Sequence, residues 1–576
     1  MNLLQNRYKN TINSIYIDPP YNTDATVIEY KNGYRESSWL SLIESRLPLG
    51  RNILRDDGVH TLTIDDYEHA PVRQLLDATF GTENYLATVA IRNNPSGRST
   101  VKGFSVNHEF ALFHGVKVGD TKVGRLAHNE EQKSRYDVID EVGAYELENF
   151  RKSSAGSDRA SRPKQFFPIF ITKVSLSIRL PRLIWSNQQV KYEVLDDCHE
   201  EEIAVWPMDA NGNEKVWRWG LDRTTRDIET LSVKQLKEGT RFEIYGRKYL
   251  NDSGVLPRTW WDKSEYSARD NGTRLLRDMF SKSVPFDFPK ALYAVVDSIR
   301  ISCPDSNGIV LDYFGGSGTT GHAVIALNRE KKENRKFILI EQGEYFDFVT
   351  KARIQKVVYS SDWKDGKAIA PHTGISHVFK VLKLESYEDT LNNLHLTRTQ
   401  AQQSLIGSMP NEAKEDYLLR YMLDVESRGS LLSVEQFKKP FDCKLKITVD
   451  SAGAYDERVI DLVETFNYMI GLRVRHVDVR VDIGFVSVTG VLPSGEKALV
   501  LWRDAEKLDY EKLNLLCEKL AINPGDSEFD VVYINGDHNI PAVFTSTEAE
   551  GGITRTLKIR QIEPEFMTLM FSTLEA

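Results

Sequence analysis

The stretch LDYFGGSGTTGHAVIALN, residues 311–328, places the tightest limit on what this chain can fold into. An apolar, strand-like run ends at Asp312, three glycines follow at Gly315, Gly316 and Gly318, and a helical pattern begins directly after them. Glycine lets the backbone turn sharply and approach a ligand closely, and a helix N-terminus favours negative charge. This order of strand, glycine turn and helix predicts an α/β domain with a ligand-binding loop.

An acid follows at the end of the next strand pattern, RKFILIE, where Glu341 closes residues 335–341. In doubly wound folds an acid in this place accepts hydrogen bonds from ribose hydroxyls. A glycine-rich stretch alone could equally be a tight structural turn, but the added acid favours an adenosine-containing cofactor. The loop lacks the GK[ST] sequence of nucleotide triphosphatases.

Strand and helix patterns alternate on both sides of a long middle region. Strands are expected at 12–18, 59–65 and 85–93, helices at 38–58 and 67–81, and after 284 a helix at 290–303, a strand at 308–314 and a helix at 318–330. Such alternation predicts a parallel sheet covered by helices. Residues 120–280 are instead short, polar and rich in Arg and Trp, which suits a recognition module.

A second motif, IYIDPPYNTD at residues 15–24, contains Asp18, Pro19, Pro20 and Tyr21. A carboxylate and a backbone carbonyl can both accept the N–H protons of an exocyclic base amine, and this makes its nitrogen more nucleophilic. Prolines hold the carbonyl rigidly, and an aromatic ring beside them can stack on a base taken out of its duplex. The alternative is a proline turn with an incidental acid, but the glycine loop favours amine chemistry.

The bulk composition, 41% hydrophobic and 27% charged, is that of a soluble globular protein of about three domains. No apolar run is long enough to span a membrane, and no secretory signal is visible, so we expect a cytoplasmic protein. Four cysteines lie singly, without a CxxC pair, at Cys198, Cys303, Cys443 and Cys517. This pattern argues against disulfides and against a metal site.

The net charge of -9 is unevenly distributed. Residues 376–576 hold 22 basic and 32 acidic groups, whereas the other 375 residues hold 52 and 51. Residues 151–190 hold eight basic groups against one acid: Arg151, Lys152, Arg159, Arg162, Lys164, Lys173, Arg179 and Arg182, against Asp158. Because phosphate binding depends on local potential, this cluster fits nucleic-acid binding, although a solvated basic face has the same pattern.

Together these motifs resemble the amino-methyltransferases that modify DNA bases with S-adenosylmethionine (SAM). The order, with DPPY before FxGxG, resembles the permuted β group of adenine-N6 methyltransferases, and in particular the modification (Mod) subunits of type III restriction–modification systems. Further matches to that family lie at Trp39, 46–47, 53–58, 64–66 and 108–115, and in the lead-in to the glycine loop, TWWDKSEYSARDNGTRLLRDMF and VPFDFPKAL.

The resemblance assigns roles to individual residues. Asp18, Pro19, Pro20 and Tyr21 are expected to hold and orient the target base. The expected SAM-binding residues are Phe286, Lys290, Asp312, Phe314, Gly315, Gly316, Ser317, Gly318 and Glu341. Among them, Phe286 and Lys290 belong to a segment that packs against the methionine part of SAM, and Glu341 binds the ribose. No metal is implied.

The resemblance also implies the domain plan and the partners. A Rossmann-like, permuted SAM-dependent methyltransferase core is expected from 1–120 (catalytic half) and 281–365 (SAM-binding half), with a target recognition domain inserted at 121–280. An α+β domain at 376–576 would serve oligomerisation or partner docking, or be a stabilising appendage. The implied partners are double-stranded DNA with a short specific site, a second copy of the chain, and a helicase–nuclease subunit.

Two alternatives to adenine-N6 methylation of DNA stay open at this point. Asp18 as the first motif residue, where Ser would favour cytosine, favours adenine over cytosine-N4. A DNA-recognition or scaffold subunit with an impaired core is the other alternative, since family members usually have a further strand before DPPY, and its loss would weaken SAM binding. Cleavage of DNA by this chain itself has no supporting motif.

Overall fold

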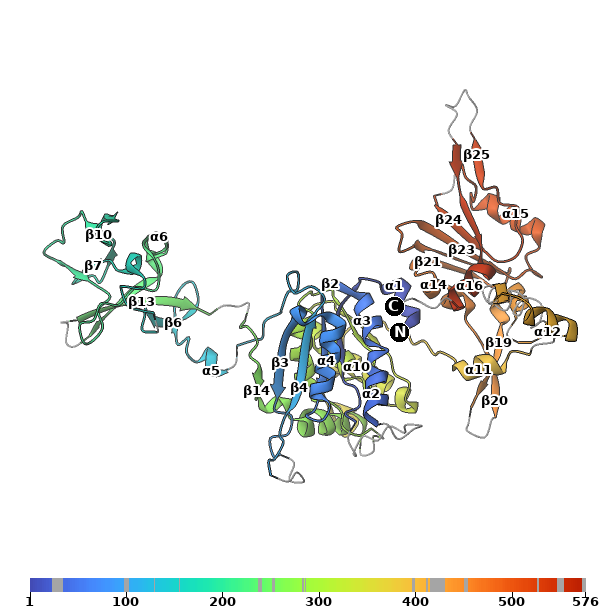
Figure 1. Cartoon of the computed structure of the whole chain (residues 1–576), viewed down its shortest axis with the longest axis horizontal. Helices are drawn as coiled ribbons and strands as arrows, with labels where there is room; N and C mark the ends of the chain where they lie inside the picture. The colour runs from blue at the N-terminus through green and yellow to red at the C-terminus, as the bar shows by residue number, and fades with distance from the viewer. Residues whose placement is uncertain are drawn as a thin grey trace. The chain divides into compact units, whose positions relative to one another are not determined.

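The computed structural model describes residues 1–571 except 23–34, 98–102, 129, 155, 237–240, 251–253, 282–283, 285, 396–398, 411–412, 415–429, 432, 450–453, 526–527 and 546–553. The chain divides into two compact units, one formed by Arg125–Pro257 and the other by Met1–Gly124 with Arg258–Ala576. Figure 1 shows that the blue N-terminal segment and the green-to-yellow segment after the smaller unit build one body together.

Seven strands form the central sheet of the larger unit, in the order β14-β3-β4-β2-β1-β15-β16. Their bounds are β1 Ile12–Ile17, β2 Leu54–Ile64, β3 Tyr85–Ile91, β4 Glu109–Gly115, β14 Trp260–Trp261, β15 Ile309–Asp312 and β16 Lys336–Leu339. Strands β2, β1, β15 and β16 are parallel neighbours, whereas β4 runs antiparallel to β2 and β3. The parallel sheet that the sequence predicts is therefore correct for these four strands but not for β4, which follows β3 without the crossover helix that parallel strands need.

Helices cover both faces of this sheet, as Figure 1 shows. On one face α2 (Arg35–Glu44), α3 (Leu47–Ile53) and α4 (His69–Phe80) pack on Ile15 and Ile17 of β1. On the other face α8 (Leu292–Ser302) and α9 (Thr319–Lys331) pack on Tyr16 of the same strand, and α10 (Thr350–Tyr359) packs against α9. The strand is buried on both faces, as its continuous apolar run predicts.

The helix expected over 38–58 is instead two helices followed by a strand. Helix α2 ends at Glu44, and α3 has Pro48 in its first turn and ends at Ile53. Proline is tolerated there because a first-turn N–H has no partner inside the helix. Strand β2 then begins at Leu54, which pairs with Ile12 of β1, so pairing in the sheet replaces the helical pattern that we expected to continue to Gly58.

The unit Arg125–Pro257 lies within the insertion expected at 121–280, and residues 258–280 belong to the larger unit. It contains a four-stranded sheet, a three-stranded sheet and a hairpin around a core that includes Phe150, Phe167 and Trp217. Its elements are α5 Glu130–Lys133, β5 Val138–Ile139, β6 Ala144–Asn149, β7 Ile169–Thr172, β8 Ile178–Arg179, β9 Leu183–Ser186, β10 Lys191–Val194, β11 Glu202–Val205, α6 Leu221–Arg226, β12 Leu231–Leu236 and β13 Arg241–Tyr249.

The C-terminal part of the larger unit is built on a five-stranded sheet, β21-β22-β23-β24-β27, with an apolar cluster on each face. The elements from the sheet to the chain end are α14 Leu462–Met469, β21 Arg473–Arg480, β22 Phe485–Val491, β23 Lys497–Arg503, α15 Tyr510–Lys519, β24 Val531–Ile534, β25 Val543–Thr545, β26 Thr554–Thr556, β27 Lys558–Gln561 and α16 Ile562–Phe571.

Shorter elements complete the larger unit: α1 Gln5–Tyr8, α7 Leu275–Phe280, β17 Trp363–Lys364, β18 Lys367–Ala368, α11 Tyr387–Asn392, α12 Gln400–Gly407, β19 Lys444–Thr448 and β20 Tyr455–Val459. Among the residues that the structure describes, no helix is both long and apolar enough to cross a lipid bilayer.

Candidate active site

Three acidic residues come to the same edge of the central sheet. Asp18 directly follows β1, Asp312 is the last residue of β15, and Glu341 follows β16. Because these three strands are parallel neighbours, their carboxyl ends lie side by side. Ligands of open α/β sheets bind at this edge. The two sequence motifs, which are nearly 300 residues apart in the chain, therefore meet here.

The turn from Asp18 to Tyr21, which the sequence motif predicts to be catalytic and which is called the catalytic turn below, is held by two neighbours that the sequence did not assign to it. The Thr63 hydroxyl, at the end of β2, donates to Asp18 Oδ1 over 2.8 Å. The indole Nε1 of Trp39, which is fully buried in α2, donates to the Pro20 carbonyl over 2.7 Å. Among the described residues, no donor engages the Pro19 carbonyl. Two hydrogen bonds thus fix the turn, and the Pro19 carbonyl is left as an acceptor for a ligand.

Tyr21 is tied to a buried acid that sequence reasoning missed. Its hydroxyl donates to Glu109 Oε2 over 2.9 Å, and Asn93 Nδ2 donates to the same oxygen over 2.8 Å. Burial, with Asp18 and Glu109 nearby, raises the pKa of Tyr21 well above its ordinary value, so the phenol stays protonated. Glu109 belongs to the motif HEFALFHG, which the sequence analysis used only as a family match. The one local sign of a role for Glu109 is its charge at the start of an apolar strand.

Lys290 also lies at the catalytic turn. Its Nζ is 3.2 Å from Asp18 Oδ1 and 2.5 Å from Glu109 Oε2, and it contacts the Tyr21 hydroxyl. Burial is the largest influence on the pKa of Asp18 and raises it; Lys290 lowers it, and Glu109 raises it further. The resemblance places Lys290 in the segment that binds SAM, whereas its side chain here contacts the residues expected to hold the base.

The glycine loop after β15 is pinned to the end of β16. Gly315 N–H donates to the Ile340 carbonyl over 2.9 Å, and Gly316 N–H donates to Glu341 Oε2 over 2.6 Å. Two residues in the loop, Gly316 (φ +49°) and Gly318 (φ +81°), have left-handed backbone conformations. Glycine adopts these without steric cost, which explains its presence at both positions. Glu341 therefore shapes the loop in addition to its expected role towards ribose.

Asp312 lies beneath this loop, almost fully buried. One of its oxygens accepts the Phe314 N–H over 2.9 Å, and the other accepts the Thr320 hydroxyl over 2.6 Å. Burial raises the pKa of Asp312 to about 7, although both hydrogen bonds oppose that rise. A carboxylate kept in so dry a place is a costly feature, and such groups concentrate at functional sites.

A buried arginine, which the sequence did not indicate, donates hydrogen bonds to the loop. Arg353, on α10, is inaccessible to solvent, and its Nη1 donates to the hydroxyls of Ser317 (2.9 Å) and Thr319 (2.8 Å). Burial lowers the pKa of Arg353 to about 9 and that of neighbouring His322 well below its usual range. Within the described residues Arg353 has no carboxylate partner, which is unusual for a buried cation.

Two aromatic side chains, Phe286 and Phe314, lie at the glycine loop. The Phe286 ring lies 3.4 Å from the point where a Cβ on Gly316 would stand, and it packs edge-on against Tyr345 at 5.0 Å between centroids. Phe314 is partly exposed within the loop. In the described part of the chain, no group of three or more His, Cys, Asp or Glu side chains could hold a metal ion.

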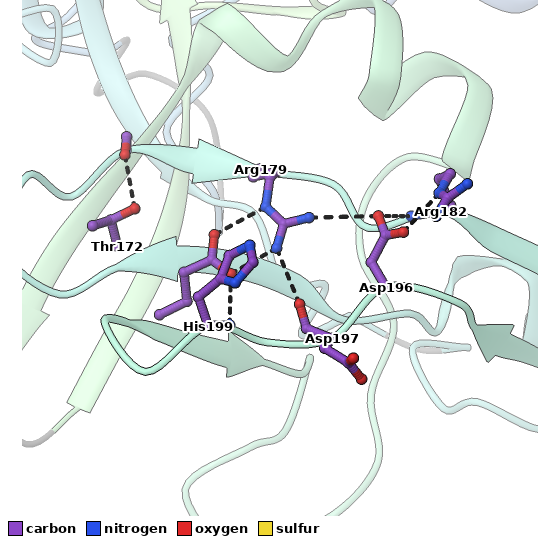
Figure 2. A network of polar contacts seen from close by, with 8 residues as sticks. Thr172, Arg179, Arg182, Asp196, Asp197 and His199 are labelled. Atoms are coloured by element: carbon purple, nitrogen blue, oxygen red, sulfur yellow. Dashed lines mark hydrogen bonds and ion pairs between the residues drawn. The ribbon is translucent and has the colours of Figure 1, made fainter.

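The basic cluster of the smaller unit is partly neutralised by acids that follow it in the chain. Arg179 pairs with Glu202 (2.6 Å) and Arg182 pairs with Asp196 (2.7 Å). Figure 2 shows that Asp196 lies between Arg179 and Arg182 and contacts both. Arg159 pairs in the same way with Glu214. Five of the eight cations make no ion pair with any described residue: Arg151, Lys152, Arg162, Lys164 and Lys173, the last of which donates to the Glu200 backbone carbonyl.

The chain is similar in sequence to known DNA methylases. The family model described as DNA methylase matches residues 12–351. The EcoPI Mod subunit, from a type III restriction–modification enzyme of Escherichia phage P1, is 28% identical over 62% of this chain, which spans 60% of that subunit's length. The type II methyltransferase M.KpnI of Klebsiella pneumoniae is 30% identical over 58% of this chain and 76% of its own.

Among solved structures, the PvuII DNA methyltransferase (cytosine-N4-specific) matches 60% of this chain and 80% of its own, with 12% identity and a TM-score of 0.28. The family model covers more than half of the chain, and it includes both the catalytic turn and the glycine loop. The chain therefore belongs to the DNA methylase family.

Proposed function

We propose that this chain is a site-specific DNA methyltransferase that transfers a methyl group from SAM to the N6 amine of a flipped adenine. The observation that carries the proposal is the placement of the catalytic turn beside the glycine loop, at the ends of the adjacent parallel strands β1 and β15. Asp18 and the Pro19 carbonyl, as acceptors for an amine, then lie beside a loop suited to a nucleoside cofactor.

The residues at the loop fit SAM by their chemistry. SAM supplies, when bound, a methyl group on a positively charged sulfur. The carboxylates of Asp312 and Glu341 suit the cationic groups and the ribose hydroxyls, and the rings of Phe286 and Phe314 suit the adenine base. A Cβ on Gly318 would lie 3.3 Å from the Thr350 backbone oxygen, so glycine lets the loop lie close to the start of α10.

The catalytic turn acts on the amine through two acceptors. Asp18 and the Pro19 carbonyl each accept one N–H of the adenine amine, so its lone pair is directed at the methyl carbon, while Tyr21 stacks on the base. SAM, when bound, would supply the methyl carbon to the amine nitrogen, and its sulfur would keep the electron pair of the C–S bond. The nitrogen, now positively charged, loses one proton, which Asp18 is placed to accept.

The finer organisation is part of the same proposal. The catalytic turn precedes the glycine loop in the chain, as in the permuted β group, and Arg125–Pro257 stands between them in sequence, where a target recognition domain would stand. The Mod subunits among the relatives are parts of type III restriction–modification enzymes. This supports a modification role, with a second copy or a helicase–nuclease subunit docking on the acidic region 376–576, in the cytoplasm where the DNA is.

Removing the unpaired cations of the smaller unit should weaken DNA binding in a salt-dependent manner. Replacing Arg162 and Lys164 together with glutamine should reduce the slope of log K against log salt by about two, since each lost phosphate contact removes roughly 0.9. The matched control replaces Arg159 and Arg182, which already have acidic partners, and should change the slope much less. Equal effects of the two double substitutions would contradict this assignment.

The function is tested by incubating the purified chain with labelled SAM and genomic DNA and then mapping the modified bases. We expect N6-methyladenine within one short recurring sequence. N4-methylcytosine at such a sequence would instead establish the cytosine alternative. Specific DNA binding without methyl transfer, and without heat of SAM binding, would establish the scaffold alternative.

A further inference from the structure

The side chain of Lys290 lies between the two side chains that the proposed function assigns to the target base. Its Nζ is 3.2 Å from Asp18 Oδ1 and 4.2 Å from the centroid of the Tyr21 ring, so it covers one face of that ring. Only 12% of the Lys290 side chain is exposed to solvent. A cation is therefore embedded in the catalytic turn.

Glu109 holds this cation in place. Its Oε2 accepts from Lys290 Nζ over 2.5 Å, from the Tyr21 hydroxyl over 2.9 Å and from Asn93 Nδ2 over 2.8 Å. The Glu109 side chain is 5% exposed and stands at the start of β4, an element separate from those that carry Asp18 and Lys290. One buried carboxylate thus ties together the lysine and the tyrosine.

We propose that Lys290 and Glu109 are positioning residues for methyl transfer: Lys290 keeps Asp18 ionised and oriented, and Glu109 anchors Lys290. This rests on the proposed function and deepens it. Thr63 and Lys290 both contact Asp18 Oδ1, and among the described residues no partner is recorded for Oδ2. The second oxygen is then left to accept an N–H of the amine.

Electrostatics explain why a cation is required here. Burial favours the neutral form of a carboxyl group, and a neutral Asp18 would present a weaker acceptor to the amine. Burial alone would lower the pKa of Lys290, but Asp18 and Glu109 outweigh it and raise that pKa, so the ammonium persists. The titratable and charged groups that face Asp18 are Tyr16, Tyr21, Glu109, Lys290 and Asp312.

Two substitutions should move the acidic limb of the pH profile in opposite directions. Single-turnover methylation is followed from about pH 5 to about pH 9 for the unchanged protein, Lys290→Met and Glu109→Gln. Losing the cation should raise the midpoint of the acidic limb by about one pH unit or more, because the pKa of Asp18 rises. In Glu109→Gln the negative charge of Glu109, which raises the pKa of Asp18, is lost, so the midpoint of the acidic limb should fall. SAM affinity should change by less than about threefold in both variants, because neither residue contacts the glycine loop.

Two results would overturn the proposal: unchanged limbs in both variants, or Lys290→Met weakening SAM binding with an unchanged limb, which would place Lys290 in the cofactor site. Thermal unfolding gives a readout that does not need methylation. Without Lys290 the folded-state pKa of Asp18 lies further above its unfolded value, so stability falls more steeply as pH rises. Asp18→Asn should therefore raise the Tm of Lys290→Met at about pH 8 by more than that of the unchanged protein.

Equal Tm gains in the two backgrounds would also overturn the proposal. The unfolding cycle separates this inference from the proposed function. A protein that methylates no DNA yet shows the coupling between Asp18 and Lys290 would contradict the function while supporting the positioning of Asp18.

Discussion

Replacing Asp18 with alanine should lower the single-turnover rate of methyl transfer by about 10³-fold while leaving SAM affinity within about threefold. The reason is geometric. Asp18 Oδ1 is held by Thr63 and Lys290, so the carboxylate is an acceptor fixed before the base arrives. Removing it takes away one of the two groups that direct the amine and the group placed to take its proton. Neither loss touches the glycine loop after β15.

The matched control is Asp56→Ala, near the amino end of β2, whereas Thr63, which holds Asp18, is at its carboxyl end. Asp56 is an exposed acid paired with Lys117, far along the strand from Thr63. Its removal should leave both the rate and SAM affinity unchanged, because it lies at the amino end of a strand parallel to β1. If Asp18→Ala and Asp56→Ala methylate DNA equally fast, the catalytic assignment of the turn is wrong. Asp18→Asn, which keeps an acceptor but loses the charge, should fall between them.

The elements of the core were predictable because their signals are local. The apolar run of β1 ends abruptly at Asp18 and Pro19, and the run of β15 ends at a glycine turn, so both strand ends can be read from the residues themselves. The direction of β4 has no such signal. An apolar run looks the same whether its strand is parallel or antiparallel, so the sequence predicts a parallel sheet without showing that β4 departs from it.

Contacts between distant residues were beyond the reach of the sequence patterns. Lys290 and Glu109 are 181 residues apart, and their ion pair exists only once β4 and the segment before α8 pack together. Charged residues are normally exposed, so Arg353 gave no sign that it would be buried behind the loop. The basic run at 151–190 stands out in sequence, yet acids at 196, 202 and 214 neutralise three of its members.

The second large effect is expected at the glycine loop, where Gly316→Val should weaken SAM binding by about 30-fold or more. Gly316 has φ +49°, a conformation that a β-branched residue adopts only with strain, and its N–H donates to Glu341. A Cβ there would stand 3.4 Å from the Phe286 ring, so any larger side chain displaces the ring or the loop. Calorimetric titration with SAM measures the loss directly.

A glycine outside the loop separates the effect of backbone strain from the effect of changing the SAM site. Gly495, in the turn between β22 and β23, also has a left-handed backbone (φ +89°), but no atom lies within 4 Å of where its Cβ would stand. Gly495→Val therefore carries the backbone strain without contact with the loop, and it should lower thermal stability while SAM binding stays unchanged. If both variants bind SAM equally well, the loop is not the cofactor site. If Gly316→Val does not fold, Gly316→Ala, with less bulk at the same φ, should still bind SAM more weakly than Gly495→Ala, because only the former places the backbone strain within the loop.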